Sequence, residues 1–513
     1  MPKAQKDNLF DLVKSLSKSE KRQFKLYVGR LGMNDDAKFM LLFTNLEKLK
    51  TYNESEILKN GLIKKSQLSN LKAHLYKQIL ISLRLNPSHQ NIRIQIREQL
   101  DFATILYHKG LYNQSLKILD KAKALAFANE EKNIAYEIIE LEKVIESQYI
   151  TRSISNRADE LTIEAKSVSQ LNVLTSKLSN LSLQLYAIFL KKGYVKNDEE
   201  YQIITTYFHD RMPDYEMEML GFREKLWLYK AYLWYSFLTQ DFLSCYKYSL
   251  KWVDLFYEHP KMISLNPVFF LRGKQYLLEA LFYIKDVGRF KDTLQKLEAI
   301  INQKNFPKSE NIESLVFLHC YSHKINLHFM EGTFEEGIPL VVEVTKGIES
   351  HRGTIDEHHI MVFYYKIACL YFGVGKNKKC IEYLDRIVNN KSLEMREDLL
   401  CFSRILNLVA HYEAGEDYHL DRLIKSTYKF LIKMEDLYQV QKEMIKFLRG
   451  LGDIYPHQLK AEFEKLYKKL KEFEDDPYER RSFLYLDILS WLESHITGES
   501  IPQIIQKKAA LPK

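Results

Sequence analysis

The stretch HCYSHKINLH, residues 319–328, contains the side chains with the clearest potential for chemistry. His319 and His323 stand one helical turn apart, so a helix would place both imidazoles on one face, with the thiol of Cys320 beside them. Imidazole and thiolate groups at this spacing could bind zinc, but a structural zinc site needs a second group of ligands. No such group is identifiable in the sequence. We therefore expect no metal site and interpret the two histidines as groove lining or core.

Catalytic motifs do not occur in the sequence. The segment GVGKNKK, residues 373–379, lacks the gap before Gly-Lys and the following Ser or Thr that a phosphate-binding loop requires. The signatures G-x-G-x-x-G, G-x-S-x-G and H-E-x-x-H are also missing. Because the sequence shows no recognisable set of catalytic residues, we expect a non-enzymatic protein without a cofactor.

Composition indicates a folded, helical chain. Of the 513 residues, 46% are hydrophobic and 28% are charged, as in folded soluble proteins. Gly (18) and Pro (11) are scarce, which favours long helices over strands with their frequent turns. The five cysteines are odd in number and form no C-x-x-C pair, which favours a reducing compartment. With no apolar signal core at the N-terminus and no apolar run long enough to cross a membrane, we expect a cytoplasmic protein.

From about residue 90 onward the apolar spacing is helical, and short turns interrupt it at regular intervals. Two segments share one register: REQLDFATILYHKGLYNQSLKILDKAKALA (97–126) and FYYKIACLYFGVGKNKKCIEYLDRIVN (363–389). Each places a small residue before a turn glycine and another after it. Two helices can cross closely only at small side chains. The small residues and turns are Ala103, Gly110 and Ser115 in the first segment, and Ala368, Gly375 and Cys380 in the second.

This register resembles the tetratricopeptide repeat, a helix–turn–helix unit that stacks into a superhelix. The resemblance implies an all-α fold, an α-α superhelix of helical hairpins. We predict a small helical domain at 1–86, a repeat solenoid at 87–435, and C-terminal repeats with a capping helix and tail at 436–513. Spacings of 40 to 48 residues exceed the ~34 of the standard repeat, so armadillo- and HEAT-like solenoids remain open. Weaker copies of the turn are expected at Gly193, Gln240, Gly288, Gly332 and Gly415.

A solenoid needs a closing helix, because its last repeat otherwise exposes an apolar face. The stretch 474–498 can supply one, with Asp476 as N-cap, Pro477 at the first helical position and Gly498 at the end. We expect the tail after Ser500 to be loosely held.

The same register predicts which side chains line the concave groove, because the first helix of each hairpin faces it. Aromatic and polar groups there suit an extended peptide or an amphipathic helix, so we expect a protein or peptide partner. The spacing of the two tryptophans also fits a core position. Some proteins of this repeat class clamp a terminal carboxylate with Lys, Arg and Asn, and no such set is visible here. The groove candidates are Arg97, Asp101, Tyr107, Trp227, Lys230, Trp234, Gln275, His319, Ser322, His323 and Asn326.

The N-terminal region is basic and lacks the repeat register. Residues 1–100 contain 19 Lys and Arg against 9 Asp and Glu, so the net charge of +8 is concentrated there. Such a head suits an acidic partner, with nucleic acid the first candidate. A capping box, Ser17-x-x-Glu20, predicts a helix start, a further helix is expected over 35–50, and a shorter one begins near Glu54.

The segment SEILKNGLIKKSQLSNLKAHL, residues 55–75, loosely resembles a helix-turn-helix, with Gly61 at the turn and Leu62, Leu68 and Leu71 packing. In bacterial regulators of similar layout, such a head precedes a tetratricopeptide body that senses a peptide. Here the glycine lies one residue from its usual place, and the apolar stripe runs on to about Leu85. We therefore interpret the second helix as a structural strut and keep a nucleic-acid-binding regulator as the alternative. Its candidate residues are Lys64, Lys65, Gln67, Asn70, Lys72 and Lys77.

Overall fold

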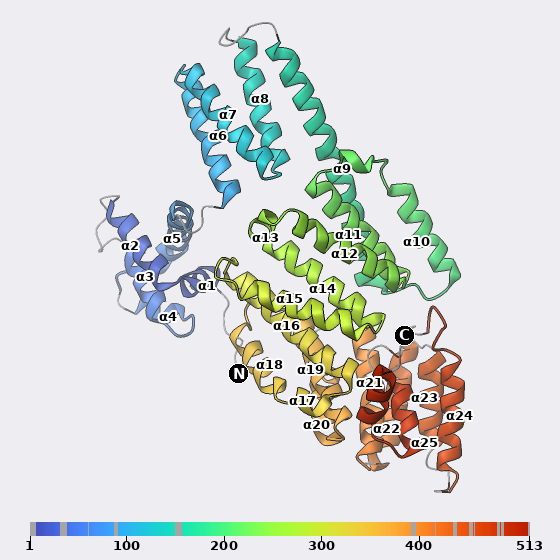
Figure 1. Cartoon of the computed structure of the whole chain (residues 1–513). Coiled ribbons are helices and arrows are strands. Elements are labelled where there is room, and N and C mark those ends of the chain that lie inside the picture. Colours follow the sequence, from blue (N-terminus) through green and yellow to red (C-terminus); the bar gives the residue numbers. More distant parts are fainter. Residues whose placement is uncertain are drawn as a thin grey trace. The chain divides into compact units, whose positions relative to one another are not determined.

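The computed structural model describes residues 7–30, 38–59, 61–86, 91–148, 156–390, 397–415, 417–433, 439–450, 455, 457–479, 483 and 487–510. Every regular element in these ranges is a helix (Figure 1). The prediction of an all-α fold is therefore confirmed. The chain divides into two compact units, Met1–Val168 and Ser169–Lys513. The predicted domain limits at 86 and 435 remain predictions.

The first unit contains two groups of helices with separate cores. The first group forms the basic head, and the second stacks as hairpins. The helices are α1 (Asn8–Ser15), α2 (Lys18–Arg30), α3 (Lys38–Lys48), α4 (Glu54–Leu58), α5 (Lys65–Leu85), α6 (Ile92–His108), α7 (Tyr112–Ala128), α8 (Lys132–Gln148) and the start of α9 (Arg157–Lys192).

The head follows the local signals in its sequence. The backbone N–H of Ser17 donates to Glu20 Oε2 at 2.7 Å, and the Glu20 N–H donates to Ser17 Oγ at 3.3 Å, so the predicted capping box starts α2. Helix α5 ends at Leu85 and buries Leu68, Leu75 and Ile79 in the head core, as its predicted stripe requires.

The turn before α5 departs from the helix-turn-helix pattern. Leu62, expected to pack, is 57% exposed, whereas Ile63 is buried. Gly61 adopts a left-handed conformation, with φ of 68°. The packing position is therefore displaced by one residue along the chain, in agreement with the misplaced glycine.

Helices α6 and α7 cross at their small residues. Ala103 and Ser115 are fully buried, and Ser115 Oγ donates to the Ala103 carbonyl at 2.8 Å. One helix thus rests on the backbone of the other, which a larger side chain would prevent.

A buried ionic network joins α7, α8 and α9. Lys123 Nζ lies 2.7 Å from Glu142 Oε2 and 2.8 Å from Glu164 Oε2, and Arg157 lies 3.3 Å from Glu142 Oε1. Burial raises the pKa of Glu142, while Lys123 and Arg157 favour its charged form. The sequence pattern gave no sign of this network.

The second unit continues α9 and stacks further antiparallel helix pairs. Its other helices are α10 (Asp198–Arg211), the 3₁₀ turn η2 (Met217–Met219), α11 (Phe222–Leu238), α12 (Phe242–Glu258), α13 (Lys261–Leu265), α14 (Pro267–Tyr283), α15 (Val287–Ile301), α16 (Glu310–Glu331), α17 (Phe334–Gly337), α18 (Leu340–Ser350), α19 (Glu357–Gly373), α20 (Asn377–Val388), α21 (Glu397–Glu413), α22 (Asp417–Lys433), α23 (Gln439–Gly450), α24 (Leu459–Lys471), α25 (Ile488–Thr497) and α26 (Ile501–Ala510).

The predicted turn residues adopt left-handed backbone conformations with one exception. Gly288 lies inside α15, and the left-handed residue is Lys285, with φ of 57°. Asp286 accepts a hydrogen bond from the Arg289 N–H and so starts α15 earlier than the glycine suggested. The confirmed turn residues are Gly110, Gly193, Gln240, Gly332, Gly375 and Gly415.

The C-terminal segment differs from its prediction. Asp476 accepts hydrogen bonds from the backbone of Tyr478 and Glu479, but these residues form a turn, and the closing helix α25 begins only at Ile488, capped by Asp487. Gly498 ends α25 as expected. Parts of the predicted helix, residues 480–482 and 484–486, lie outside the described residues.

The tail after Ser500, expected to be loose, forms helix α26 and packs against α16 and α25. Ile504 and Ile505 are buried, and the side-chain amide of Gln506 donates to the Gly332 carbonyl at 3.2 Å. A Cβ added to Gly332 would lie 2.8 Å from the carbonyl oxygen of Pro502. The prediction was wrong because contacts between residues far apart in sequence hold this short helix.

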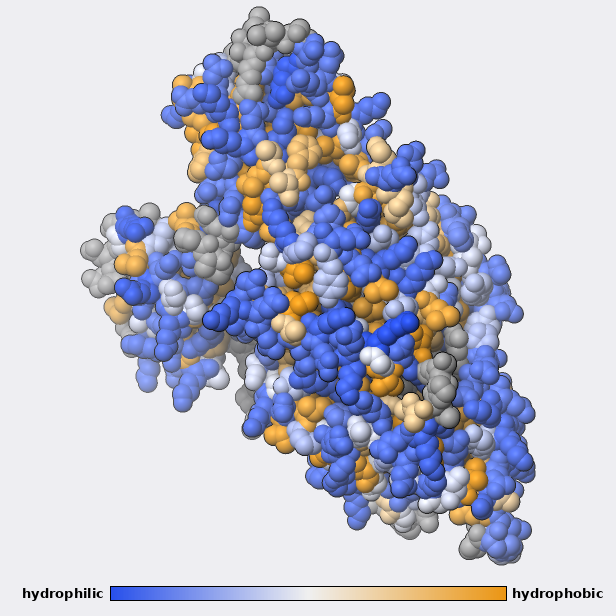
Figure 2. All heavy atoms as spheres, in the orientation of Figure 1, coloured by the Kyte–Doolittle hydropathy of each residue, from blue (hydrophilic) through white to orange (hydrophobic). Residues whose placement is uncertain are grey.

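None of the helices within the described ranges is long and apolar enough to cross a bilayer. On the face drawn in Figure 2, hydrophilic residues dominate and apolar residues form small separate patches.

Close helix packing in the second unit predicts the effect of one methyl group. A Cβ added to Gly347 would lie 1.9 Å from Cε2 of Phe317, so either the buried Phe317 ring or the two helices α18 and α16 must shift in the Gly347→Ala variant. We expect a loss of about 1–3 kcal/mol in the free energy of unfolding. All four tryptophans lie in this unit, at 227, 234, 252 and 491, so tryptophan fluorescence during urea unfolding reports on it alone.

The matched control is Gly450→Ala in α23, where an added Cβ meets nothing within 4 Å. It should be neutral or slightly stabilising, since alanine is the better helix former. Equal unfolding curves for the two variants would contradict the close approach of α16 and α18.

Candidate functional site

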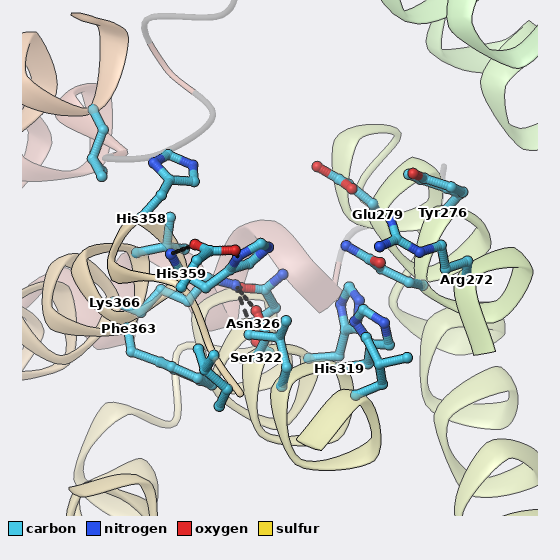
Figure 3. A pocket seen from close by; sticks show the side chains of 18 of the residues that line it. Arg272, Tyr276, Glu279, His319, Ser322, Asn326, His358, His359, Phe363 and Lys366 are labelled. Carbon is cyan, nitrogen blue, oxygen red and sulfur yellow. Dashed lines mark hydrogen bonds and ion pairs between the residues drawn. The ribbon is translucent and has the colours of Figure 1, made fainter. Parts of the chain in front are cut away.

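A cavity of about 490 Å³ lies in the second unit, on the face formed by the first helices of successive hairpins. Its walls come from α9, α11, α14, α16, α19 and α21, and we call this surface the groove (Figure 3). Large aromatic side chains form much of the wall, including Tyr186, Phe189, Trp234, Tyr276, Phe363 and Phe402.

Helix α16 supplies the floor of the groove. His319, Ser322, His323 and Asn326 follow one another at helical spacing, so they share one face of this helix. Ser309 caps its start and Gly332 closes its end. His319 and His323 are buried, at 3% and 4% exposure.

Both floor histidines are neutral. Burial, assisted by the positive charge of Arg272, lowers the pKa of His319 to about 3. Burial and Lys366 lower the pKa of His323 well below its ordinary value. His319 Nε2, His323 Nδ1 and Trp234 Nε1 have no hydrogen-bond partner among the described residues. A neutral imidazole with such a low pKa is too weak a base for proton transfer at neutral pH.

Lys366 on α19 reaches across to α16. Its Nζ donates to Ser322 Oγ at 2.6 Å, to Asn326 Oδ1 at 2.7 Å and to the Ser322 carbonyl at 3.2 Å. The side chain keeps some accessible surface toward the cavity, but the surrounding protein lowers its pKa to about 8, against an opposing effect of Glu279. All three hydrogen-bond acceptors are uncharged, so Glu279 acts on the ammonium only through space.

Helix α14 forms the opposite side of the groove, with Arg272, Tyr276 and Glu279 (Figure 3). Burial raises the pKa of Tyr276 to about 12, although Arg272 hydrogen-bonds it and opposes the shift. The Glu279 carboxylate accepts a hydrogen bond from the Tyr283 hydroxyl at 2.9 Å. At the mouth, Asp356 caps α19 and lies 2.7 Å from His359 Nδ1.

The described residues contain no group of three or more His, Cys, Asp or Glu arranged to hold a metal ion. Burial raises the pKa of the Cys320 thiol beside the histidines to about 12, which disfavours the thiolate that zinc binding needs.

The structure brings most of the predicted groove residues of this unit together. Trp227 and Lys230 lie on α11 but do not line the cavity; the Lys230 ammonium is 4.5 Å from the Trp227 ring centroid. Burial and the nearby Arg272 lower the pKa of Lys230 to about 8. The residues that line the cavity itself are Trp234, Gln275, His319, Ser322, His323 and Asn326.

The three predicted residues on α6 belong to the other unit and have partners there. Arg97 lies 3.5 Å from Glu137, Asp101 lies 3.6 Å from Arg84, and the Tyr107 hydroxyl donates to Gln148 at 2.8 Å. Each of these pairs is largely exposed.

The head candidates split into two kinds. Lys64, Lys65, Asn70 and Lys77 are exposed, and Gln67 accepts a hydrogen bond from Lys38 at 3.1 Å. Lys72, in contrast, is partly buried, lies 2.7 Å from Asp7 Oδ2 and hydrogen-bonds Tyr52. Lys72 therefore holds the head together, and the exposed residues remain candidates for a partner.

Sequence reasoning missed Lys366, Arg272 and Glu279. Lys366 stands two residues before Ala368, the position that Asp101 occupies before Ala103. The register that selected Asp101 would have selected Lys366 in the second segment. Glu279 stands before Gly288 as Asp101 stands before Gly110, so the same register would have selected it, whereas Arg272 falls at none of the selected positions.

The unusual pKa of Lys366 predicts a pH dependence of stability. Between about pH 8 and 10.5 the unfolded chain binds a proton at this lysine that the folded chain has released. Stability relative to a Lys366→Met variant should therefore rise with pH across this window. Urea unfolding followed by tryptophan fluorescence measures the difference, and the exposed Lys378→Met serves as control. A difference that stays constant from pH 7 to 10 would contradict the shifted pKa.

No protein-family model, no curated protein and no solved structure matches the chain. The description of the groove therefore relies on the structure of this chain.

Proposed function

We propose that this chain is a non-enzymatic adaptor that binds an extended peptide segment of a partner protein in the groove. The main observation behind the proposal is a single cavity that is lined by the first helix of each of six hairpins. Its walls are aromatic, and several polar side chains converge on it. We also propose that the hairpins are of the tetratricopeptide type, on the register of small residues at the crossings of α6 with α7 and α19 with α20.

The electrostatics of the groove support binding over catalysis. The pKa values of His319 and Tyr276 lie far from neutrality, at about 3 and 12, so these two groups hold their protonation state and exchange protons poorly. The pKa of Lys366 lies at about 8, but its ammonium is engaged in hydrogen bonds with Ser322 and Asn326. A cytoplasmic location is part of the proposal, supported by five buried cysteines with free thiols.

The second candidate function is nucleic-acid binding by the head. It is favoured by the exposed Lys64, Lys65 and Lys77, which make no ion pair with a described residue. Positive charges at the start of a helix and along its exposed face suit phosphate contacts.

Blocking the groove should abolish peptide binding. Gln275 lines the cavity and is half-buried, so an indole in the Gln275→Trp variant would occupy the space of a bound peptide. Peptides selected from a displayed random library on the wild-type chain should bind this variant at least about tenfold more weakly, a loss of about 1.4 kcal/mol. Fluorescence polarisation measures the affinity.

Val342→Trp is the matched control, because Val342 is 58% exposed on α18 and lines no part of the cavity. It should bind the selected peptides as the wild type does. If the Gln275→Trp variant binds the selected peptides with the affinity of the wild type, the binding site lies outside the groove. Robust turnover of a generic hydrolase substrate by the wild-type chain would contradict the non-enzymatic assignment.

The nucleic-acid alternative makes a separate prediction. If the head binds phosphates, the full chain should retain a short DNA or RNA duplex at low salt. The triple variant Lys64→Glu, Lys65→Glu, Lys77→Glu should lose that retention, with the salt slope falling by about 0.9 for each phosphate contact removed. The exposed Lys109→Glu is the control. Absence of retention by the wild-type chain at low salt removes this candidate.

A further inference from the structure

Two cations face the groove without a carboxylate partner. Lys366 donates only to the neutral oxygens of Ser322 and Asn326, and Arg272 hydrogen-bonds the neutral phenol of Tyr276. No described carboxylate forms an ion pair with either of them. Elsewhere in the second unit a cation between two helices can have a carboxylate partner, as Lys291 has Glu331 at 3.2 Å. Lys366 is half-buried, whereas Arg272 lines the cavity but is exposed. A partly desolvated charge such as that of Lys366 attracts an opposite charge from a ligand.

Two cations and two carboxylates line the cavity, namely Arg272, Lys366, Glu279 and Asp356. Arg272 and His359 both disfavour a proton on His319, and Lys366 does the same for His323. Glu279 acts on Lys366 through space but accepts a hydrogen bond from Tyr283, and Asp356 lies 2.7 Å from His359 Nδ1, so neither carboxylate pairs with the two cations. A negatively charged ligand group would therefore be stabilised above α16.

The position of the cations within the groove decides what kind of group fits. They stand on α14 and α19, with α16 between them, and Figure 3 shows Arg272 and Lys366 on opposite sides of the floor. Apolar walls continue on both sides, from Phe189 and Trp234 at one end to Phe402 at the other. A charged group in the middle of a groove with apolar surface at both ends suits an internal acidic side chain better than a chain terminus.

We propose that the groove contains a subsite for a single Asp or Glu side chain, embedded in an apolar stretch of the bound peptide, with its carboxylate between Lys366 and Arg272. The proposal rests on the peptide-binding function proposed above and names the chemistry of its ligand. The apolar residues on either side of the acid pack against the aromatic walls, and the acid selects the register of the peptide in the groove.

The test uses the full chain and a fluorescent peptide, acetylated at its N-terminus and amidated at its C-terminus, with one central Glu flanked by Leu and Phe. A second peptide carries Gln in place of Glu, and a third carries Gln and a free C-terminal carboxylate. We expect saturable binding of the Glu peptide, with the Gln peptide at least about tenfold weaker, as for loss of a charged hydrogen bond.

The protein variants locate the charge. Lys366→Met and Arg272→Gln should each weaken the Glu peptide about tenfold or more and leave the Gln peptide unchanged, whereas Glu279→Gln should tighten the Glu peptide by removing a like charge. Lys378→Met, exposed on α20, should have no effect. Because only the Glu peptide responds, a variant that fails to fold is recognised by its loss of Gln-peptide binding.

Several outcomes would overturn the subsite. Equal binding of the Glu and Gln peptides would leave the groove function intact and remove the acidic subsite. Tighter binding of the free-carboxylate peptide than of the Glu peptide would assign the cations to a chain terminus. If none of the three peptides binds while library-selected peptides do, the acid-centred ligand is wrong and the proposed function stands.

Discussion

Close approach of neighbouring helices is the constraint on which the rest of this structure depends. The Ser115 hydroxyl rests on the Ala103 carbonyl, and Gly347 lies against the Phe317 ring with no room for a methyl group. Such contacts are possible only where side chains are small, so their positions set the rotation of each helix about its axis. Once the rotation is set, the remaining face of every first helix is determined, and those faces form the groove. The chemistry of the site is therefore a consequence of packing on the other side of the same helices.

Local signals account for most of what the sequence predicted about the fold. The capping box at Ser17, the stripe on α5 and the glycine turns act over a few residues, and each forms as expected. Two errors share a cause. Lys285 replaces a predicted glycine turn because a cap at Asp286 fixes the helix start, and α26 forms because α16 and α25 cover its isoleucines. Neither a left-handed lysine nor a docking surface far away in the chain leaves a pattern that local reasoning can read.

The candidate site was predictable as far as the repeat register reaches. It selected the floor of the groove on α16 correctly as one helical face, because spacing along a single helix fixes which side chains lie together. It could not pair that face with Arg272 or Lys366, since the partners lie on other helices. It also grouped Arg97 and Tyr107 with residues of a different unit, because a register states the position within a hairpin and not which hairpins enclose a cavity. The sequence thus predicts which residues share one face of a helix, whereas the stacking of the helices determines which faces meet to form the site.

Several polar groups of the groove oppose folding. Three buried nitrogens there, on Trp234, His319 and His323, lack a hydrogen-bond partner among the described residues, and each such group costs roughly 1–3 kcal/mol when desolvated. Lys366 adds a charge whose lowered pKa shows that the fold disfavours it. Replacing a buried charged or unsatisfied polar group by an apolar side chain of similar volume is often neutral or stabilising. Under the proposed function, a bound ligand would supply the hydrogen bonds and the opposite charge that the fold leaves unsupplied in this cavity, and its binding energy would offset their cost.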